Sequence, residues 1–420
     1  MTGGTGSAAG TAAARRAVEA VWRIEAARIV ATLTRFTGDF GLAEDVAQEA
    51  LAAALTQWPQ EGVPRNPGAW LTTTARRRAV DAFRRRERLD ARLPQLATEA
   101  EQVDQGWDPD TIDDDVLRLI LIACHPVLRR EAQLALTLRV VGGLSTEQIA
   151  HAFLVPVATI QQRVVRAKKT LAAAAVSFEV PPRAKLPARL AAVLQMLYLI
   201  FNEGHSASSG ADWLRPDLAR EGLRLARMFA ELVPEEPEAH GLVALMELTA
   251  ARFPARLAPD GSPVLLADQD RTRWDHGLID RGRRRLARAD RLGRGRGPYG
   301  LQAAIAECHA VAVSVADTDW ERIVLLYEAL GQVAPSPVVE LNRAVAVSMA
   351  TGPASALRIV DDLVAGGSLA GYHLLPGVRA ELLTRLGRRA EARDEFERAI
   401  RLTGNQRERA VLQAKLAALG

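Results

Sequence analysis

The segment from Gly142 to Leu171 constrains the fold most strongly, because its pattern predicts two short helices joined by a tight turn. Ser145 can cap the first helix, and Gln148, three residues later, completes the reciprocal pattern of a capping box. Pro156 suits the start of the second helix, where its missing N–H needs no partner. Four apolar residues recur in that helix at helical spacing and should face a core: Ile160, Val164, Ala167 and Leu171.

The second of these helices also carries a polar face, away from the apolar stripe or along its edges. Its members are Thr159, Gln162, Arg163, Arg166 and Lys169. Hydroxyl, amide and guanidinium groups are the ones that contact base edges and phosphates in DNA-binding helices. We therefore predict a helix-turn-helix that reads duplex DNA. An ordinary helical hairpin with a solvated charged face is the alternative that this segment alone leaves open.

An acidic and amide-bearing face is predicted near the N-terminus. Asp45, Gln48 and Glu49 stand at i, i+3 and i+4, so they share one side of a helix within residues 38–55. Such a patch suits docking on a basic or amide-rich partner surface. The alternative is a face that is merely solvated.

Residues 68–88 predict a further amphipathic helix, with Leu71, Ala75 and Ala79 in its buried stripe. The residues opposite or flanking that stripe are Thr73, Arg77, Arg78, Asp81, Arg84 and Arg85. The run of arginines that starts at Arg76 predicts a local positive field that can hold a phosphate backbone. Trp70, with Trp58 before it, offers a flat surface for an unstacked base, although a core role for both rings is equally open.

Taken in order, these segments resemble a bacterial RNA polymerase sigma factor of the extracytoplasmic-function group within the sigma-70 family. Residues 43–50 resemble region 2.2, which contacts the clamp helices of the polymerase β′ subunit. Residues 67–86 resemble regions 2.3 and 2.4, which melt and read the −10 promoter element. Residues 131–171 resemble region 4, which reads the −35 element.

The resemblance implies two partners, core RNA polymerase (β′ clamp and β flap) and promoter DNA, and a chain that performs no chemistry and needs no cofactor. It assigns the face of Asp45, Gln48 and Glu49 to polymerase, the surface from Trp70 to Arg85 to the −10 element, and the face from Thr159 to Lys169 to the −35 element. The target sequences stay open. Region 2.4 is richer in arginine than in relatives, and Gln161, Gln162 and Val165 replace residues that are frequent in the second helix.

The composition predicts an all-α chain. Its 420 residues suffice for two or three domains, and the net charge of +4 makes local clusters more important than the total. Two cysteines predict no disulfide framework, and the absence of a long apolar run or signal sequence predicts a cytoplasmic protein. The expected boundaries are a disordered start at 1–14, region 2 at 15–92, an acidic linker at 93–115, region 4 at 116–176, a proline-rich linker at 177–189 and a helical extension at 190–420.

The extension predicts stacked helix pairs. Leu386, Gly387, Ala392, Phe396 and Ala399 follow a tetratricopeptide-like pattern, and residues 341–363 form a weaker copy at about the expected repeat of 34 residues. Stacked pairs bury a continuous core and create a concave surface. The resemblance to sigma factors that carry such an extension implies that it regulates the sigma modules, by adding to or replacing an anti-sigma factor.

No segment of the extension predicts a catalytic or metal site with established spacing. The candidates are Glu203, His205, Asp268, Asp270, Asp275, His276, Cys308 and His309, with Cys124 and His125 before the extension. We expect buried cysteines beside hydrogen-bonded histidines, and a salt-bridged corner around Asp268–Asp275. Two rival functions are a conventional helix-turn-helix regulator with a helical-repeat sensor domain and an enzyme fused to a DNA-binding module.

Overall fold

The structure is a computed structural model that describes residues 5–87, 109–153, 155–174, 176, 178–179, 181–182, 184–205, 216–258, 264–367, 369–404 and 406–419. Throughout these residues the regular elements are helices, which confirms the predicted all-α class. None of the described helices is both long and apolar enough to cross a bilayer. The chain forms two compact units that divide between Met196 and Leu197, and each is described by itself.

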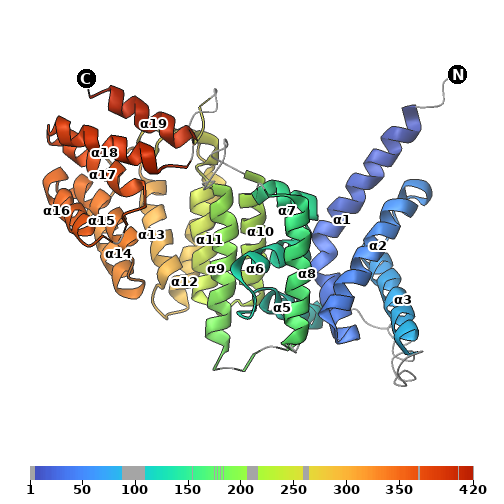
Figure 1. Cartoon of the computed structure of the whole chain (residues 1–420). Helices are drawn as coiled ribbons and strands as arrows, with labels where there is room; N and C mark the ends of the chain where they lie inside the picture. The colour runs from blue at the N-terminus through green and yellow to red at the C-terminus, as the bar shows by residue number, and fades with distance from the viewer. Residues whose placement is uncertain are drawn as a thin grey trace. The chain divides into compact units, whose positions relative to one another are not determined.

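The first unit contains two groups of helices (Figure 1). The first group is α1 (Thr5–Thr37), α2 (Phe40–Glu61) and α3 (Pro67–Glu87). The second group is α5 (Pro109–Ala123), α6 (Arg130–Leu136), a π-helical turn (Thr137–Val141), α7 (Thr146–Phe153) and α8 (Val157–Ala173). Helix α9 (Leu186–His205) begins in this unit and continues into the next.

Small side chains allow α1 and α2 to pack closely. Ala43, Ala47, Ala50 and Ala54 recur along one side of α2 and are fully buried. Asp39 starts α2, because its Oδ1 accepts a hydrogen bond of 3.0 Å from the backbone N–H of Leu42. The predicted stripe of α3 is buried as well, at Leu71, Ala75 and Ala79.

Helix α5 begins at Pro109, inside the range that the sequence assigned to an acidic linker. Asp115, the last residue of that range, is fully buried; Arg118 contacts its Oδ1 at 2.7 Å and Arg35 contacts its Oδ2 at 3.3 Å. This acidic residue therefore joins α5 to α1. Residues 93–108 of the expected linker lie outside the described residues. The side chains of the expected disordered start, 1–14, lie outside them as well, but its backbone from Thr5 onward belongs to α1.

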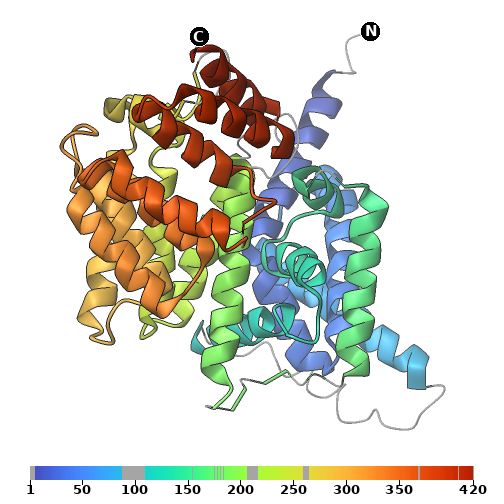
Figure 2. The ribbon, with the colours of Figure 1, turned by 60° about the vertical axis from the view of Figure 1, so that its left-hand side comes forward.

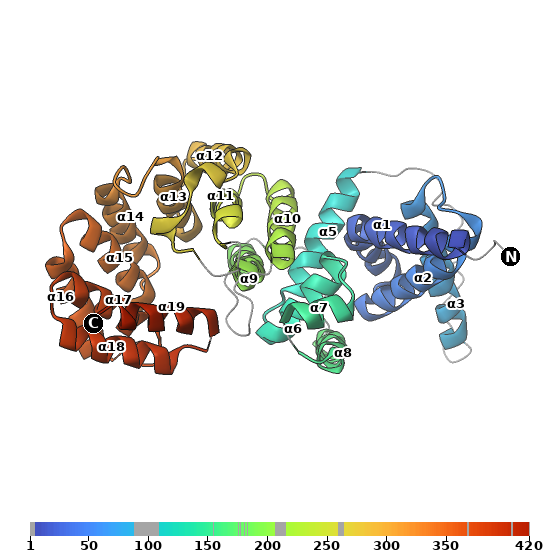
Figure 3. The same cartoon turned by 90° about the horizontal axis from the view of Figure 1, so that it is seen from above.

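The second unit continues α9 and arranges its later helices in a curved row, which Figure 3 shows from α11 to α18. These helices are α10 (Pro216–Leu232), α11 (Pro237–Ala250), α12 (His276–Arg291), α13 (Pro298–Val311), α14 (Trp320–Val333), α15 (Pro337–Ala350), α16 (Pro353–Ala365), α17 (Leu374–Arg385), α18 (Arg389–Leu402) and α19 (Gln406–Ala417). Short 3₁₀ turns lie between α11 and α12, at Phe253–Ala255, Leu266–Asp268 and Arg271–Arg273.

Glycine allows the backbones of α9 and α10 to approach each other. A Cβ atom built on Gly204 would lie 2.3 Å from the backbone nitrogen of Ala219, and one on Gly222 would lie 2.9 Å from that of Phe201. Real Cβ atoms do not tolerate such distances, so both positions require glycine, which has no side chain.

The predicted helix pair at the end of the chain is present as α17 and α18 (Figure 2). Gly387 joins the two helices with a φ of 76°, in the left-handed region that favours glycine. Ala392, Phe396 and Ala399 are buried as the repeat pattern predicted. The weaker copy at residues 341–363 forms α15 and α16, which share one core cluster with α17 and α18.

Candidate nucleic-acid interface

The outer face of α3 carries the predicted −10 contacts. Thr73, Arg77, Asp81 and Arg84 are exposed and lie opposite the buried stripe, whereas Arg78 is partly buried. Arg85 belongs to the same helix, but its side chain lies outside the described residues. The helix therefore presents hydroxyl and guanidinium groups to solvent, as phosphate and base contacts require.

One arginine of the same helix, Arg76, does not contribute an exposed charge. Its Nε is shielded from solvent and has no hydrogen-bond partner among the described residues. Burial, together with the nearby charge of Arg35, lowers the pKa of Arg76. The exposed guanidinium groups of α3 are therefore those of other arginines, among them Arg77 and Arg84.

The two tryptophans have different roles. Trp58 is 2% exposed and belongs to the core. Trp70 is partly exposed at the start of α3 and packs edge-on against Trp58, with 5.5 Å between ring centroids. The core ring thus fixes the position of the partly exposed one, and only Trp70 remains a candidate surface for an unstacked base.

The helix-turn-helix has the predicted geometry. Ser145 and Gln148 form the capping box: the Gln148 N–H donates to Ser145 Oγ at 3.2 Å, and the Ser145 N–H donates to Gln148 Oε1 at 2.8 Å. Ile160, Val164, Ala167 and Leu171 of α8 are all buried. Of the predicted −35 residues, Gln162, Arg166 and Lys169 are exposed, and Thr159 and Arg163 are partly exposed. A shallow hollow follows this outer face beside Gln161, Val165 and Arg166.

The sequence analysis missed an ionic cluster that joins α2 to the helix-turn-helix. Glu44 is only 4% exposed, and its carboxylate contacts Arg139 Nε at 3.4 Å and Lys168 Nζ at 3.0 Å. Lys168 Nζ also lies 2.5 Å from Asp45 Oδ1. Burial opposes the charge of Lys168, but the two carboxylates outweigh it and raise the pKa of the ammonium. No periodicity reveals this cluster, because its partners are more than ninety residues apart.

The predicted polymerase-binding face is consequently engaged within the chain. Asp45 is paired with Lys168 of α8. Glu49 accepts a hydrogen bond of 2.8 Å from Arg78 of α3, and both side chains of this pair are substantially exposed. Gln48 lies between them and is partly exposed. The three residues share one side of α2, as their spacing predicted.

The candidate metal and catalytic residues form no cluster of three or more histidine, cysteine or acidic side chains within the described ranges. Cys124 and Cys308 are both buried free thiols. Burial raises the pKa of Cys124 to about 11 and also raises that of Cys308, so neither thiol is activated as a nucleophile.

The corner around Asp268–Asp275 is built mainly from caps rather than from the expected salt bridges. Asp270 accepts a hydrogen bond from the Thr272 N–H, and Asp275 accepts one from the Leu278 N–H and starts α12. Arg271 donates from Nη1 to the carbonyl of His309 at 2.8 Å and to a second carbonyl of the same segment at 2.7 Å. Carboxylates placed just before helices satisfy free backbone N–H groups, which accounts for this difference.

His309 also departs from the expectation of a hydrogen-bonded core histidine. Its Nδ1 is shielded from solvent and finds no hydrogen-bond partner among the described residues. Burial, with the charges of Arg252 and Arg271 nearby, lowers its pKa to about 4, so the ring is neutral at pH 7. The ring packs edge-on against Trp320, with 5.2 Å between centroids.

Both groups of helices in the first unit match known protein families. Residues 22–89 match the family described as Sigma-70 region 2, and residues 118–171 match Sigma-70, region 4. Residues 189–290 match a family of unknown function (DUF6596). "Uncharacterized protein R00370" of Rhizobium meliloti (strain 1021) is 45% identical over 391 residues, which cover 91% of each chain. No solved structure matches the chain.

The helical fold, the helix-turn-helix and the two matched regions define a specificity subunit of RNA polymerase, which binds core polymerase and promoter DNA. The chain belongs to the sigma-70 family and carries a C-terminal helical extension.

Proposed function

We propose that the chain is a sigma factor of the extracytoplasmic-function type that acts in the cytoplasm and is regulated by its C-terminal helical unit. The spacing of its two matched regions supports this type, since only residues 90–117 separate them. Polymerase performs the chemistry, and this chain supplies the choice of promoter.

The observation that carries the proposal is the pair of outward polar faces on α3 and α8. In both helices the apolar stripe is buried while arginine, lysine, threonine and glutamine face solvent. The α3 face around Trp70, Thr73, Arg77 and Arg84 contacts single-stranded −10 bases and their phosphates. The α8 face around Gln162, Arg166 and Lys169 sets the register on duplex −35 DNA.

The α2 face of Asp45, Gln48 and Glu49 contacts the β′ clamp, while the module that contains α8 contacts the β flap. Asp45 cannot contact the clamp while it is paired with Lys168, so polymerase binding must break this ion pair. The free chain and the polymerase-bound chain therefore differ in the contact between α2 and α8.

Charge reversal on α2 tests the polymerase contact. The double variant Asp45→Lys/Glu49→Lys should reduce binding to core polymerase by at least about tenfold, since it repels a basic partner surface. Glu61→Lys is the matched control, because Glu61 is exposed near the end of the same helix. Thermal melting should show that the variants remain folded, since the Glu49 pair is exposed and contributes less than about 1 kcal/mol.

The same measurement separates this function from a conventional helix-turn-helix regulator. A regulator that needs no polymerase contact should bind DNA and act equally well after the charge reversal. Unchanged affinity of the double variant for core polymerase would therefore refute the assigned face.

The regulatory role of the second unit rests on its helical-repeat architecture and on the length of the extension. Truncation near residue 180, after α8, removes it while keeping both matched regions. We expect polymerase with the truncated chain to transcribe its promoters at a different level, or with a different response to the inducing signal, than polymerase with the full chain. Identical output and identical regulation with and without the extension would contradict a control role.

A further inference from the structure

A cavity of about 500 Å³ lies inside the second unit, among α9, α11, α13, α14 and α15. Its size falls within the range of small-molecule sites, roughly 300–1,000 Å³. Leu245, Leu248, Ile305, Leu330 and Val339 form its apolar walls. None of the residues that line it is acidic, and one of them, Arg252, carries a permanent charge.

Arg252 follows α11 and lacks a counter-ion among the described residues. Its Nε is shielded from solvent and has no hydrogen-bond partner among them. Burial, followed by the charge of Arg271, lowers the pKa of Arg252 to about 10, so the guanidinium remains protonated at neutral pH. Arg252 is partly exposed, but a guanidinium with a shielded, unbonded Nε and no counter-ion among the described residues is costly, and proteins normally pair such groups.

The neighbours of Arg252 increase the positive potential. Arg256 is 9% exposed, and burial together with the charge of Arg252 lowers its pKa to about 9. Arg271 is partly buried and donates to backbone carbonyls rather than to a carboxylate. His309, which lines the cavity, is neutral at pH 7 and offers a nitrogen without a partner.

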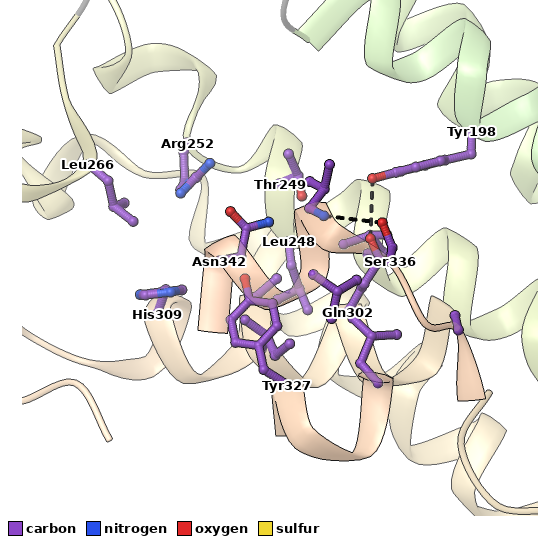
Figure 4. A pocket seen from close by; sticks show the side chains of 17 residues that line it. Tyr198, Leu248, Thr249, Arg252, Leu266, Gln302, His309, Tyr327, Ser336 and Asn342 are labelled. Carbon is purple, nitrogen blue, oxygen red and sulfur yellow. Dashed lines mark hydrogen bonds between the residues drawn. The ribbon is translucent and has the colours of Figure 1, made fainter. Parts of the chain in front are cut away.

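Polar groups occupy opposite sides of this cavity (Figure 4). Arg252, His309 and Tyr327 lie on one side, and Tyr198 and Ser336 lie on the other. The Tyr198 hydroxyl donates to Gln302 Oε1 at 3.3 Å, which fixes its position. The site therefore offers one charged group, several neutral hydrogen-bonding groups and apolar walls between them.

We propose that this cavity binds a small organic monocarboxylate, whose carboxylate pairs with Arg252 and whose apolar body contacts Leu248, Ile305 and Leu330. A planar guanidinium matches the two oxygens of a carboxylate. A single permanent charge in the lining favours a ligand with one negative charge over a phosphate monoester, which carries nearly two at neutral pH.

The stability of the ligand-free full-length chain tests the state of Arg252. Arg252→Met keeps much of the apolar volume and removes the unpaired charge, so it should raise the melting temperature by about 2 °C or more. Arg271→Met is the control, because it leaves the carbonyls of His309 and Ala312 without their donor and should lower the melting temperature. A fall for Arg252→Met as large as that for Arg271→Met would show a structural arginine and overturn the proposal.

Ligand binding to the same full-length protein tests the occupant. Phenylacetate and octanoate serve as carboxylates, phenylacetamide and octanamide as neutral isosteres, and octyl phosphate as the more highly charged alternative. At least one carboxylate should raise the melting temperature and bind about tenfold or more tightly than its amide, and Arg252→Met should abolish that difference. No response to either carboxylate, or a stronger response to octyl phosphate, would overturn the proposal.

These measurements need neither polymerase nor DNA. Their outcome is therefore independent of the sigma function and of any regulatory role of the second unit. Coupling between the cavity and transcription would rest additionally on the proposed regulatory role.

Discussion

Replacing Lys168 by methionine should favour polymerase binding, although it changes a residue of the DNA-reading helix. Lys168 is the residue of α8 that pairs with Glu44 and Asp45 of α2, at 3.0 and 2.5 Å. Methionine keeps much of the apolar stem and removes the charge. Glu44 keeps its contact with Arg139, so the substitution does not leave this buried carboxylate without a partner.

The magnitude follows from the burial of the partners. Lys168 is 16% exposed and Glu44 is 5% exposed at their side chains, so their charge-assisted hydrogen bond should contribute about 1.5–3 kcal/mol. Asp45 is 64% exposed, and its pair with Lys168 adds less than about 1 kcal/mol after solvent screening. A loss of about 1.5–3 kcal/mol from the contact raises the ratio of open to closed chains roughly 10- to 150-fold.

The assay is the affinity of the full chain for an isolated β′ clamp fragment, which touches α2 and does not involve DNA. A chain that must open first binds with an affinity reduced by its open fraction. Lys168→Met should therefore bind the fragment about tenfold or more tightly than the parent chain. Lys169→Met is the control, since it removes the same charge from an exposed neighbouring position on the same helix. Equal affinity for both variants, or weaker binding by Lys168→Met, would refute the reasoning.

Two further predictions concern the second unit. Gly204→Ala should destabilise the protein by about 2 kcal/mol or more, measured by denaturant unfolding, because its Cβ meets the backbone at Ala219; Gly331→Ala in α14, where nothing lies within 4 Å, should be neutral or stabilising. The pKa of His309 is about 4 when folded against 6.5 unfolded, so the unfolded chain binds more protons between these values. Stability should fall by about 2–3 kcal/mol as the pH drops from 6.5 to 4, and His309→Gln should flatten that slope; an unchanged slope would contradict a neutral buried ring.

Local patterns predicted much of the fold and of the candidate interface. The capping box at Ser145, the apolar stripe of α8 and the stripe of α3 each depend on residues within one helical turn or one helix. Hydrophobic periodicity and capping chemistry encode such features directly. The exposed residues of α3 and α8 follow from the same stripes, since the polar face lies opposite the buried one.

Features that depend on distant residues could not be predicted in this way. Glu44 and Lys168 are 124 positions apart, and neither stands out from its local pattern. Arg252 follows an apolar helix and resembles any terminal arginine, so its place in the cavity depends on the distant helices that supply the other lining residues. The acidic linker was expected to extend to residue 115, but Asp115 belongs to α5 and is buried, because its carboxylate contacts Arg35 of a different helix.

The central claim is that the first unit gives promoter choice to core RNA polymerase. The most direct measurement mixes the purified full-length chain with core polymerase and a broad library of promoter sequences, and maps the transcript starts by sequencing. We expect stable association and initiation at a restricted set of sites that share −10 and −35 elements. Failure to associate, or starts indistinguishable from those of core polymerase alone, would contradict the account.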